Sequence, residues 1–296
     1  MTIRFTKMHG LGNDFVILDC RKARHGLDSP AAAGPAGLSP DRARRIADRR
    51  RGIGCDQVIV LNAAPDASAC DAVLDIFNPD GSRAEACGNA TRCVAALLGT
   101  ELDRTRIILE SAGRLLNCLR LEDGRVSVDM GPPRFEWDAI PLAEPVNTSA
   151  LDLGVDTANL GTGTAVSMGN PHCVFFTEHL DTLPIETLGP ALEHHALFPE
   201  RANIGFARIV DRHTIRLRVW ERGAGLTSAC GSGACAAAVG AIRRGLTDGA
   251  VDLELDGGIL SVTWREGGSV TMTGPVAMSF EGIFRADDHP LAEETP

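Results

Sequence analysis

The sequence predicts an α+β protein built from two related domains. Short apolar runs, most of them rich in the β-branched residues typical of strands, recur along the 296 residues and are separated by turn-forming residues. Few segments have the composition of stable helices, and the best are residues 88–98 and 231–244. Each follows a strand-like run, a polar turn and the tripeptide Ala-Cys-Gly, which indicates that one structural unit occurs twice.

The length of the chain supports two domains. A single hydrophobic core usually stops growing at about 250 to 300 residues, and this chain has 296. We expect a first half over residues 1–130, completed by a returning strand near 270–284, and a second half over residues 131–269. The sequence Gly131-Pro132-Pro133 favours a boundary between the halves.

The strand-like runs are bounded by Gly, Pro, Asp or Asn, which interrupt strands. In chain order they are FVILD, QVIVL, VLDIF, RIILES, RVSVDM, HCVFF, FARIV, TIRLRVW, VDLEL and SVTMTGPV. Ser39 and Pro40 predict the start of a short helix that carries a basic stretch. Gly99 and Gly245 predict the ends of the two main helices. Residues 26–40 and 147–164 are weakly patterned and predict surface connections.

Charge and cysteine usage limit the classes of function. The chain has 39 acidic and 29 basic residues, a formal net charge of −10, and no long basic stripe, which argues against nucleic acid or a membrane surface as partner. No run approaches the roughly 18 apolar residues of a membrane helix, so we expect a cytoplasmic protein. The nine cysteines form no C-x-x-C pair, which favours thiols in a reducing compartment and no metal site. A homodimer is compatible with the sequence, which contains no direct signal for one.

The two Ala-Cys-Gly tripeptides place Cys87 and Cys230 at helix starts. Exposed backbone N–H groups and the positive end of the helix dipole favour anions there, so we expect a lowered thiol pKa at both cysteines. The N–H groups that follow are placed to bind a carboxylate, those of Gly88, Asn89, Gly231 and Ser232. Two such helix ends at one α-carboxylate would put a sulfur on each side of the neighbouring carbon, as inversion by two bases requires.

The sequence gives little support for pyridoxal phosphate, with which most enzymes stabilise an α-carbanion. It contains two lysines, Lys7 and Lys22, and neither lies in a glycine-rich phosphate-binding context. Hydrogen-bond donors and the two helix dipoles would instead stabilise the carboxylate as it becomes enolate-like. We therefore expect no cofactor.

Polar residues recur at matching positions in the two halves. Asn78 lies nine residues before Cys87, and Glu221 lies nine residues before Cys230. Asn13 in GLGNDFVIL and Asn170 in SMGNPHCVFF form a second match. An isolated asparagine in such a dipeptide is often only a turn former, so the repetition is what makes these positions candidates.

Six motifs make the sequence resemble diaminopimelate epimerase, a bacterial enzyme of lysine and peptidoglycan precursor synthesis. They are KMHGLGNDFVILD, GCDQVIVL, FNPDGSRAEACGNATRC, MGNPHCVFF, LFPERANIGFARIVDR and VWERGAGLTSACGSGACAA, in this order between residues 3 and 284. The resemblance implies two pseudo-symmetric domains, each a mixed β-sheet or barrel closed around a central helix, with the active site in the cleft between them. It also implies interconversion of LL- and meso-diaminopimelate without cofactor or metal.

The resemblance also assigns roles to individual residues. It makes Cys87 and Cys230 the catalytic bases and His172 and Glu221 the residues that tune the two thiols. It places Gly88, Asn89, Gly231 and Ser232 at the reacting carboxylate. It places the rest of the substrate among Asn13, Gln57, Asn78, Asn170, Asn203, Glu221 and Arg222. The long 26–40 connection and Thr91 depart from the family pattern, but neither touches an assigned site.

Three other functions predict different residues. A proline racemase or a phenazine-pathway isomerase would share the two-domain plan, but proline has no distal charged groups for Asn78, Asn203, Glu221 and Arg222 to bind. A thiol redox or metal-binding protein would be expected to carry C-x-x-C pairs. A pure binding module would bind its ligand without exchanging the α-proton.

Overall fold

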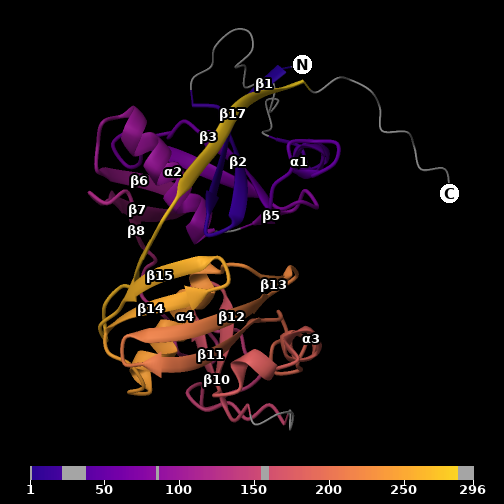
Figure 1. Cartoon of the computed structure of the whole chain (residues 1–296), viewed down its shortest axis with the longest axis vertical. Helices are drawn as coiled ribbons and strands as arrows, with labels where there is room; N and C mark the ends of the chain where they lie inside the picture. Colours follow the sequence, from indigo (N-terminus) through magenta and orange to yellow (C-terminus); the bar gives the residue numbers. More distant parts are fainter. Residues whose placement is uncertain (1, 22–37, 85–86, 155–159, 286–296) are drawn as a thin grey trace, which may run out of the picture. The chain divides into compact units, whose positions relative to one another are not determined.

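The computed structural model describes residues 2–21, 38–84, 87–154 and 160–285, which form strands β1 to β17 and helices α1 to α4 (Figure 1). The prediction of an α+β fold is confirmed. Most of the predicted 26–40 connection and residues 155–159 of the 147–164 connection lie outside the described residues. Within the described part of the chain, no helix is long and apolar enough to cross a membrane.

The chain divides into two compact units. The described residues of unit 1 are 2–9, 14–21, 38–84, 87–117 and 277–285. Those of unit 2 are 10–13, 118–154 and 160–276. The sequence had placed the division near residue 130. In the structure the chain leaves unit 1 within β7, and β17 brings it back to pair antiparallel with β1.

Unit 1 consists of a sheet and two helices. Its elements are β1 (Thr2–Gly10), β2 (Asn13–Asp19), α1 (Pro40–Ala47), β3 (Gln57–Asn62), β4 (Ala72–Phe77), β5 (Arg83–Ala84), α2 (Gly88–Glu101), β6 (Arg106–Ser111), β7 (Arg114–Arg120) and β17 (Ala277–Arg285). The predicted helix start is confirmed, since the Ser39 side chain caps α1 by accepting from the N–H of Arg42. One core cluster of this unit packs α1 against β2 and β3.

Unit 2 has the same kinds of element. They are β8 (Val126–Asp129), β9 (Gly163–Ser167), β10 (Pro171–Phe176), the 3-10 turn η2 (Leu180–Thr182), α3 (Ile185–Glu193), β11 (Asn203–Asp211), β12 (Thr214–Glu221), β13 (Gly225–Thr227), α4 (Gly231–Arg243), β14 (Ala250–Leu255), β15 (Gly258–Thr263) and β16 (Thr271–Gly274). A core cluster packs α3 against β10 and β11.

The two units share one order of strand pairings. In unit 1, β2 runs parallel to β3, β3 antiparallel to β4, and β4 antiparallel to β5 and parallel to β6. In unit 2, β10 runs parallel to β11, β11 antiparallel to β12, and β12 antiparallel to β13 and parallel to β14. The main helix lies at the same place in both sequences of elements, between β5 and β6 and between β13 and β14. The repeated pattern read in the sequence is therefore a repeated topology.

The main helix of unit 2, α4, has short side chains and is surrounded by strands. Almost every residue of α4 from Gly231 to Ala241 is buried, and the helix packs against strands β9, β10, β11, β12, β14 and β15. A helix buried on all sides needs an apolar surface all round, which its run of alanines supplies. Its end before Gly245 is confirmed, with Gly245 at a φ of 70°. The predicted end of α2 at Gly99 is wrong: the helix continues to Glu101, because the left-handed backbone comes at Asp103 instead.

Candidate active site

The topology brings the predicted polar residues to one edge of the sheet in each unit. The first residues of parallel neighbours lie at the same edge, and an antiparallel neighbour ends there. In unit 1, Gln57 begins β3 and Asn78 follows the last residue of β4. In unit 2, Asn203 begins β11 and Glu221 ends β12. Each main helix then begins at the cysteine that follows the next short strand.

In unit 1, Gln57 and Asn78 contact each other directly. Gln57 Nε2 donates to Asn78 Oδ1 at 3.0 Å, and Asn78 Nδ2 donates to Ser82 Oγ at 3.0 Å. The backbone N–H of Asn78 also donates to the carbonyl of Ser82. The Asn78 side chain is therefore held by its own turn, with Gln57 beside it.

The cysteine of unit 1 lies where the sequence placed it. Cys87 is the N-cap residue of α2, has extended backbone angles and is half-buried, while Asn89 is buried in the first turn. Thr91 N–H and Thr91 Oγ1 both bond the Cys87 carbonyl. The N–H groups of Gly88 and Asn89 belong to the first turn of α2, whose amides have no acceptor within the helix. This is the helix start that an anion would need.

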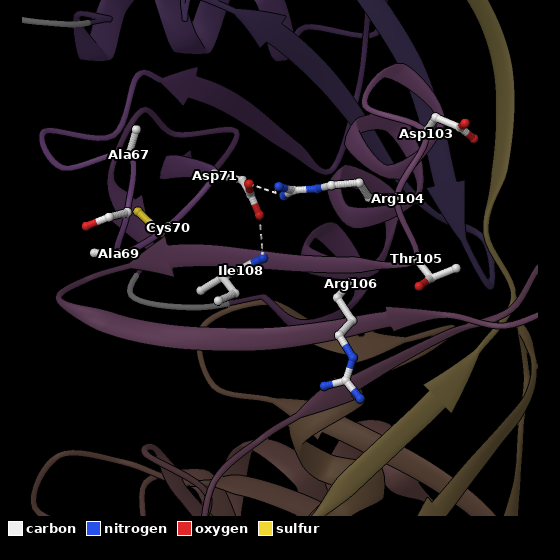
Figure 2. Close-up of a pocket in the computed structure, with 10 residues that line it drawn as sticks. Ala67, Ala69, Cys70, Asp71, Asp103, Arg104, Thr105, Arg106 and Ile108 are labelled. Atoms are coloured by element: carbon white, nitrogen blue, oxygen red, sulfur yellow. Dashed lines mark hydrogen bonds and ion pairs between the residues drawn. The ribbon is translucent and has the colours of Figure 1, made fainter.

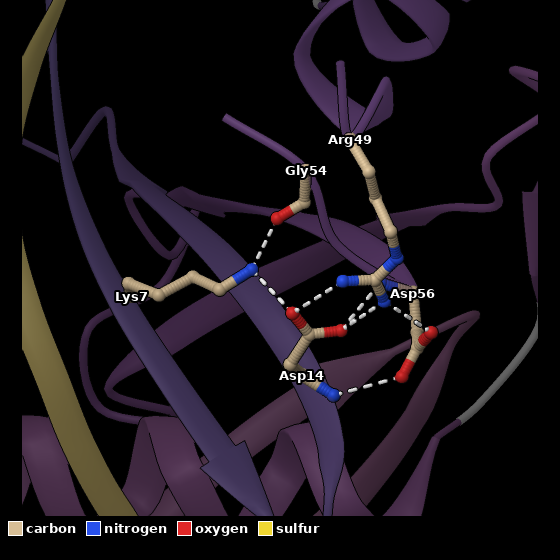
Figure 3. A network of polar contacts seen from close by, with 5 residues as sticks. All are labelled: Lys7, Asp14, Arg49, Gly54 and Asp56. Atoms are coloured by element: carbon tan, nitrogen blue, oxygen red, sulfur yellow. Dashed lines mark hydrogen bonds and ion pairs between the residues drawn. The ribbon is translucent and has the colours of Figure 1, made fainter. Parts of the chain in front are cut away.

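A charged network fixes the start of β2 against the start of β3 (Figure 3). The Asp14 and Asp56 side chains each accept the backbone N–H of the other residue at 2.9 Å, and Arg49 bonds both carboxylates. The Lys7 ammonium lies against Asp14 and the carbonyl of Gly54. Burial alone would raise the pKa of Asp14, but the bonds from Arg49 and Lys7 outweigh it and lower the pKa to about 2. Lys7 thus has a structural partner in unit 1.

Two predicted substrate-binding residues, Asn13 and Gln57, are sequence neighbours of Asp14 and Asp56. Asn13 begins β2, directly before Asp14, and is half-buried; by its contacts it belongs with residues 10–13 of unit 2. Gln57 directly follows Asp56 and pairs in register with Phe15. The network therefore fixes the backbone directly next to both predicted substrate-binding residues.

In unit 2, a chain of hydrogen bonds joins three of the predicted residues. His172 Nε2 bonds Asn170 Oδ1 at 2.9 Å, and Asn170 Nδ2 donates to Ser232 Oγ at 3.3 Å. Burial lowers the pKa of His172 to about 3, and the positive charge of Arg222 acts in the same direction. His172 is therefore neutral near pH 7, and its Nε2–H donates to the Asn170 amide oxygen.

Asn203 connects the β10 strand with the turn that follows β12. Its Nδ2 donates to the carbonyl of Pro171 at 3.0 Å, and its Oδ1 accepts the backbone N–H of Arg222 at 3.0 Å. The Arg222 guanidinium donates to the carbonyl of Glu200 at 3.1 Å. Asn203 is thus buried and satisfied by protein groups, and its effect on a ligand would act through Arg222.

Cys230 differs from the expectation of a lowered pKa. It is the N-cap residue of α4 and is buried, with its sulfur 3.8 Å from Ser232 Oγ. Burial raises the pKa of its thiol well above the ordinary value, and the negative charge of Glu221 raises it further. The N–H of Gly233 and the Ser232 side chain act in the opposite direction and do not outweigh burial. The expected thiolate at Cys230 is therefore wrong for this structure, because desolvation exceeds the effect of the helix start.

Glycine at position 233 allows its own backbone N–H to lie close to the Cys230 sulfur. A Cβ at this position would lie 3.2 Å from Cys230 Sγ and 3.0 Å from a methyl group of Val219. The Glu221 carboxylate accepts a hydrogen bond from Thr227 Oγ1 on β13. The thiol therefore lies between a carboxylate, a hydroxyl and a backbone amide, which is an environment suited to holding and releasing a proton.

We expect Glu221→Gln to lower the pKa of Cys230, because the substitution removes the negative charge beside the thiol while leaving it buried. The measurement is the pH dependence of Cys230 alkylation by iodoacetamide, followed by peptide mapping. Glu178→Gln, an exposed carboxylate of the same unit, serves as the control. The same alkylation profile in Glu221→Gln and wild type would contradict the contact.

The residues that the sequence missed lie farther along the chain. Thr227 and Glu193 both contact the turn that carries Glu221 and Arg222. Glu193 lies on α3, 30 residues before Gly223, and no local pattern relates the two. In unit 1 the structure brings Gln57 and Asn78 into contact. In unit 2 a chain of contacts runs from His172 through Asn170 and Ser232 to Cys230.

A surface pocket of about 560 Å³ in unit 1 contains none of the predicted residues (Figure 2). Cys70, Asp71, Arg104 and Ile108 are among the residues that line it. Arg104 bonds the Asp71 carboxylate, which also accepts the N–H of Ile108 at 2.8 Å. These contacts join the turn before β4 to β6, and the charges of Asp71 and Arg104 pair with each other.

Known proteins match the chain over nearly its whole length. The model of the family "Diaminopimelate epimerase" matches residues 5–136 and 164–279. A diaminopimelate epimerase of Acidiphilium cryptum is 54% identical over 278 residues, which cover 94% of this chain and 95% of the relative.

Two solved structures have the same fold at low sequence identity. A hydroxyproline epimerase from Agrobacterium vitis is 17% identical, with a TM-score of 0.66, covering 97% of this chain and 93% of the other. A phenazine biosynthesis protein of Bacillus anthracis is 16% identical, with a TM-score of 0.65, covering 96% of this chain and 99% of the other. These likenesses confirm the predicted two-domain pseudo-symmetric fold. The family match, the identity of the relatives and the two matched cysteine helices lead to one conclusion: this chain belongs to the diaminopimelate epimerase family.

Proposed function

We propose that this chain interconverts LL- and meso-diaminopimelate by proton transfer at one α-carbon, with Cys87 and Cys230 as the two bases. The observation that supports it best is the repeated topology, which gives each unit one cysteine at the start of a buried helix. Membership of the family supplies the substrate. The reaction belongs to lysine and peptidoglycan precursor synthesis.

The proposed reaction needs two sulfurs on opposite faces of the carbon. One thiolate removes the α-proton, so that the C–H bond breaks, an S–H bond forms and the electron pair stays on the substrate as an enolate-like carbanion. The other thiol delivers its proton to the opposite face, and its sulfur keeps the S–H electron pair. Electrons and protons balance without an oxidant or a reductant. The raised pKa of Cys230 suits it to begin a turnover as the proton donor.

The first turns of α2 and α4 would bind the reacting carboxylate. The amide N–H groups of Gly88, Asn89, Gly231 and Ser232 lie in those turns. Their positive potential stabilises the substrate more strongly as the carboxylate takes on the second negative charge of the enolate-like state. This is a contribution that a cofactor makes in other amino-acid racemases.

His172 and Asn170 would position the pocket rather than exchange protons. His172, with a pKa of about 3, is neutral near pH 7, and its one ring N–H is bonded to the Asn170 amide oxygen. Asn170 in turn fixes Ser232, whose hydroxyl lies near the Cys230 sulfur. Glu221 would tune the Cys230 thiol through its charge.

The distal end of the substrate would be bound by Arg222 and by the amide side chains. Diaminopimelate carries a second carboxylate and ammonium group, and a planar guanidinium matches the former. We assign Gln57 and Asn78 of unit 1 and Asn13 of unit 2 to this end of the substrate, with Asn203 as the residue that holds Arg222.

The experiment is to incubate the purified chain with LL-diaminopimelate in deuterated water and to follow the α-carbon by NMR. We expect formation of the meso isomer with deuterium at the inverted carbon, without added metal or pyridoxal phosphate, and no exchange with L-proline. Proline turnover at a similar rate would favour the racemase alternative. Binding of diaminopimelate without exchange would leave a binding module.

We also propose that two copies of the chain associate through β17 in the cytoplasm. Met278, Phe280 and Ile283 on this strand are each about half exposed, which is unusual for three large apolar side chains on one strand. Sedimentation equilibrium of wild type and Phe280→Glu tests the association, since the charge should shift a dimer towards monomer. A wild-type monomer at all concentrations would contradict it.

A further inference from the structure

Glu193 is a buried carboxylate with three partners, of which one lies on β12 and one in the turn after β12. It is the last residue of α3 and is 3% exposed. Its Oε2 accepts from the Trp220 indole Nε1 at 2.8 Å, and its Oε1 accepts the backbone N–H of Gly223 at 2.9 Å. Arg201 lies at 3.5 Å from Oε1 and supplies a positive charge.

These two bonds flank Glu221 and Arg222, the residues proposed to tune Cys230 and to bind the substrate. Trp220 directly precedes Glu221, and Gly223 directly follows Arg222. One carboxylate therefore holds the chain on both sides of the Glu221-Arg222 pair. The Arg222 N–H bond to Asn203 fixes the same turn from the β11 side.

Packing of α3 on Trp220 keeps the carboxylate in place. A Cβ at Gly189 would lie 2.4 Å from the Trp220 ring, so glycine allows the indole to lie directly on the helix. The indole N–H then meets Glu193 one turn farther along α3. Removal of these partners would leave a buried carboxylate without hydrogen bonds, which would lower the stability of the folded protein.

We propose that Glu193 is a positioning residue of the epimerase, which fixes the Glu221-Arg222 turn so that Glu221 lies against Cys230 and Arg222 lies toward the substrate. This inference rests on the proposed function. A displaced turn would leave Cys230 without the nearby negative charge and would move Arg222 away from its place. Both consequences differ from a simple loss of stability.

The test compares wild type with Glu193→Gln and Glu193→Ala in the full chain. Gln keeps one acceptor but opposes a donor at the other contact, and Ala removes both bonds. Glu186→Gln, an exposed carboxylate in the first turn of the same helix, is the matched control. The readouts are the indole N–H resonance of Trp220 in an ¹⁵N-labelled sample, the rate of Cys230 alkylation at fixed pH, kcat, KM and the melting temperature. The chain has three tryptophans, so the indole region is simple to assign.

We expect the Trp220 resonance to shift in both variants and kcat to fall by about 10- to 100-fold in Glu193→Gln, with a smaller change in KM. Cys230 alkylation should become faster, since a thiol of lower pKa holds more thiolate at a given pH. The control should match wild type in every readout. Glu193→Ala should show the larger effects where it folds, and Glu193→Gln decides the outcome where it does not.

Wild-type kcat and wild-type Cys230 alkylation in a folded variant whose Trp220 resonance has moved would overturn the proposal. A lower melting temperature with unchanged kcat would also overturn it, because Glu193 would then be structural alone. If wild type itself fails to epimerise diaminopimelate, the proposed function fails. The alkylation and indole readouts still decide in that case whether Glu193 positions the turn.

Discussion

Replacing either Cys87 or Cys230 by alanine is expected to lower kcat for epimerisation by at least about 10³-fold. Each thiol serves one face of the carbon, and the loss of either leaves that face without a proton donor or acceptor. Water in its place would be neither positioned nor of suitable pKa. The effect should be on kcat, since the helix N–H groups that bind the carboxylate belong to the backbone and remain.

The measurement follows each isomer separately in deuterated water. A single variant should fail to invert either isomer, while the remaining sulfur can still exchange the α-proton on its own side. Cys93→Ala and Cys235→Ala are the controls, because both cysteines are fully buried within the same two helices. Melting curves check the fold. Near wild-type turnover in Cys87→Ala or Cys230→Ala would show that the two-thiol scheme is wrong.

The fold was largely predictable because its strongest signals are local. Strands of alternating or continuous β-branched residues, and helices that begin after Ala-Cys-Gly, depend on neighbouring residues alone. The repeat was visible for the same reason. The end of α2 was missed because glycine is tolerated inside a helix when the residues after it, here Thr100 and Glu101, continue the turn.

The positions of the candidate residues in the fold were predictable, but the electrostatics around them were not. Asn78, Glu221 and the two cysteines were found by their repeated spacing. The raised pKa of Cys230 was not, because it depends on burial by distant strands and on a carboxylate nine residues away that the fold turns back onto the sulfur. Glu193 was not found either. Its partners Trp220 and Gly223 are 27 and 30 residues away, and only the packing of α3 on β12 brings them together.

Arg222→Lys is expected to lower kcat/KM for diaminopimelate by about 100-fold, because poor positioning of the distal end misplaces the reacting carbon. Lysine keeps the positive charge but lacks the planar pair of donors that matches a carboxylate. The guanidinium of Arg222 reaches the Glu200 carbonyl, while its backbone N–H is held by Asn203, so the substitution leaves the turn itself in place. The loss should therefore come from the side chain.

Two comparisons separate geometry from charge. Arg222→Met removes both, so its kcat/KM should fall further than that of Arg222→Lys. The charge of Arg222 also helps to lower the pKa of His172, and burial is the larger cause, so His172 should stay neutral near pH 7 in both variants by NMR titration. Arg218→Lys is the control and should keep wild-type kinetics, because the guanidinium of this β12 residue bonds Asp256 after β14. An unchanged kcat/KM in Arg222→Lys would place this side chain outside the substrate pocket, and the distal carboxylate would then need another partner.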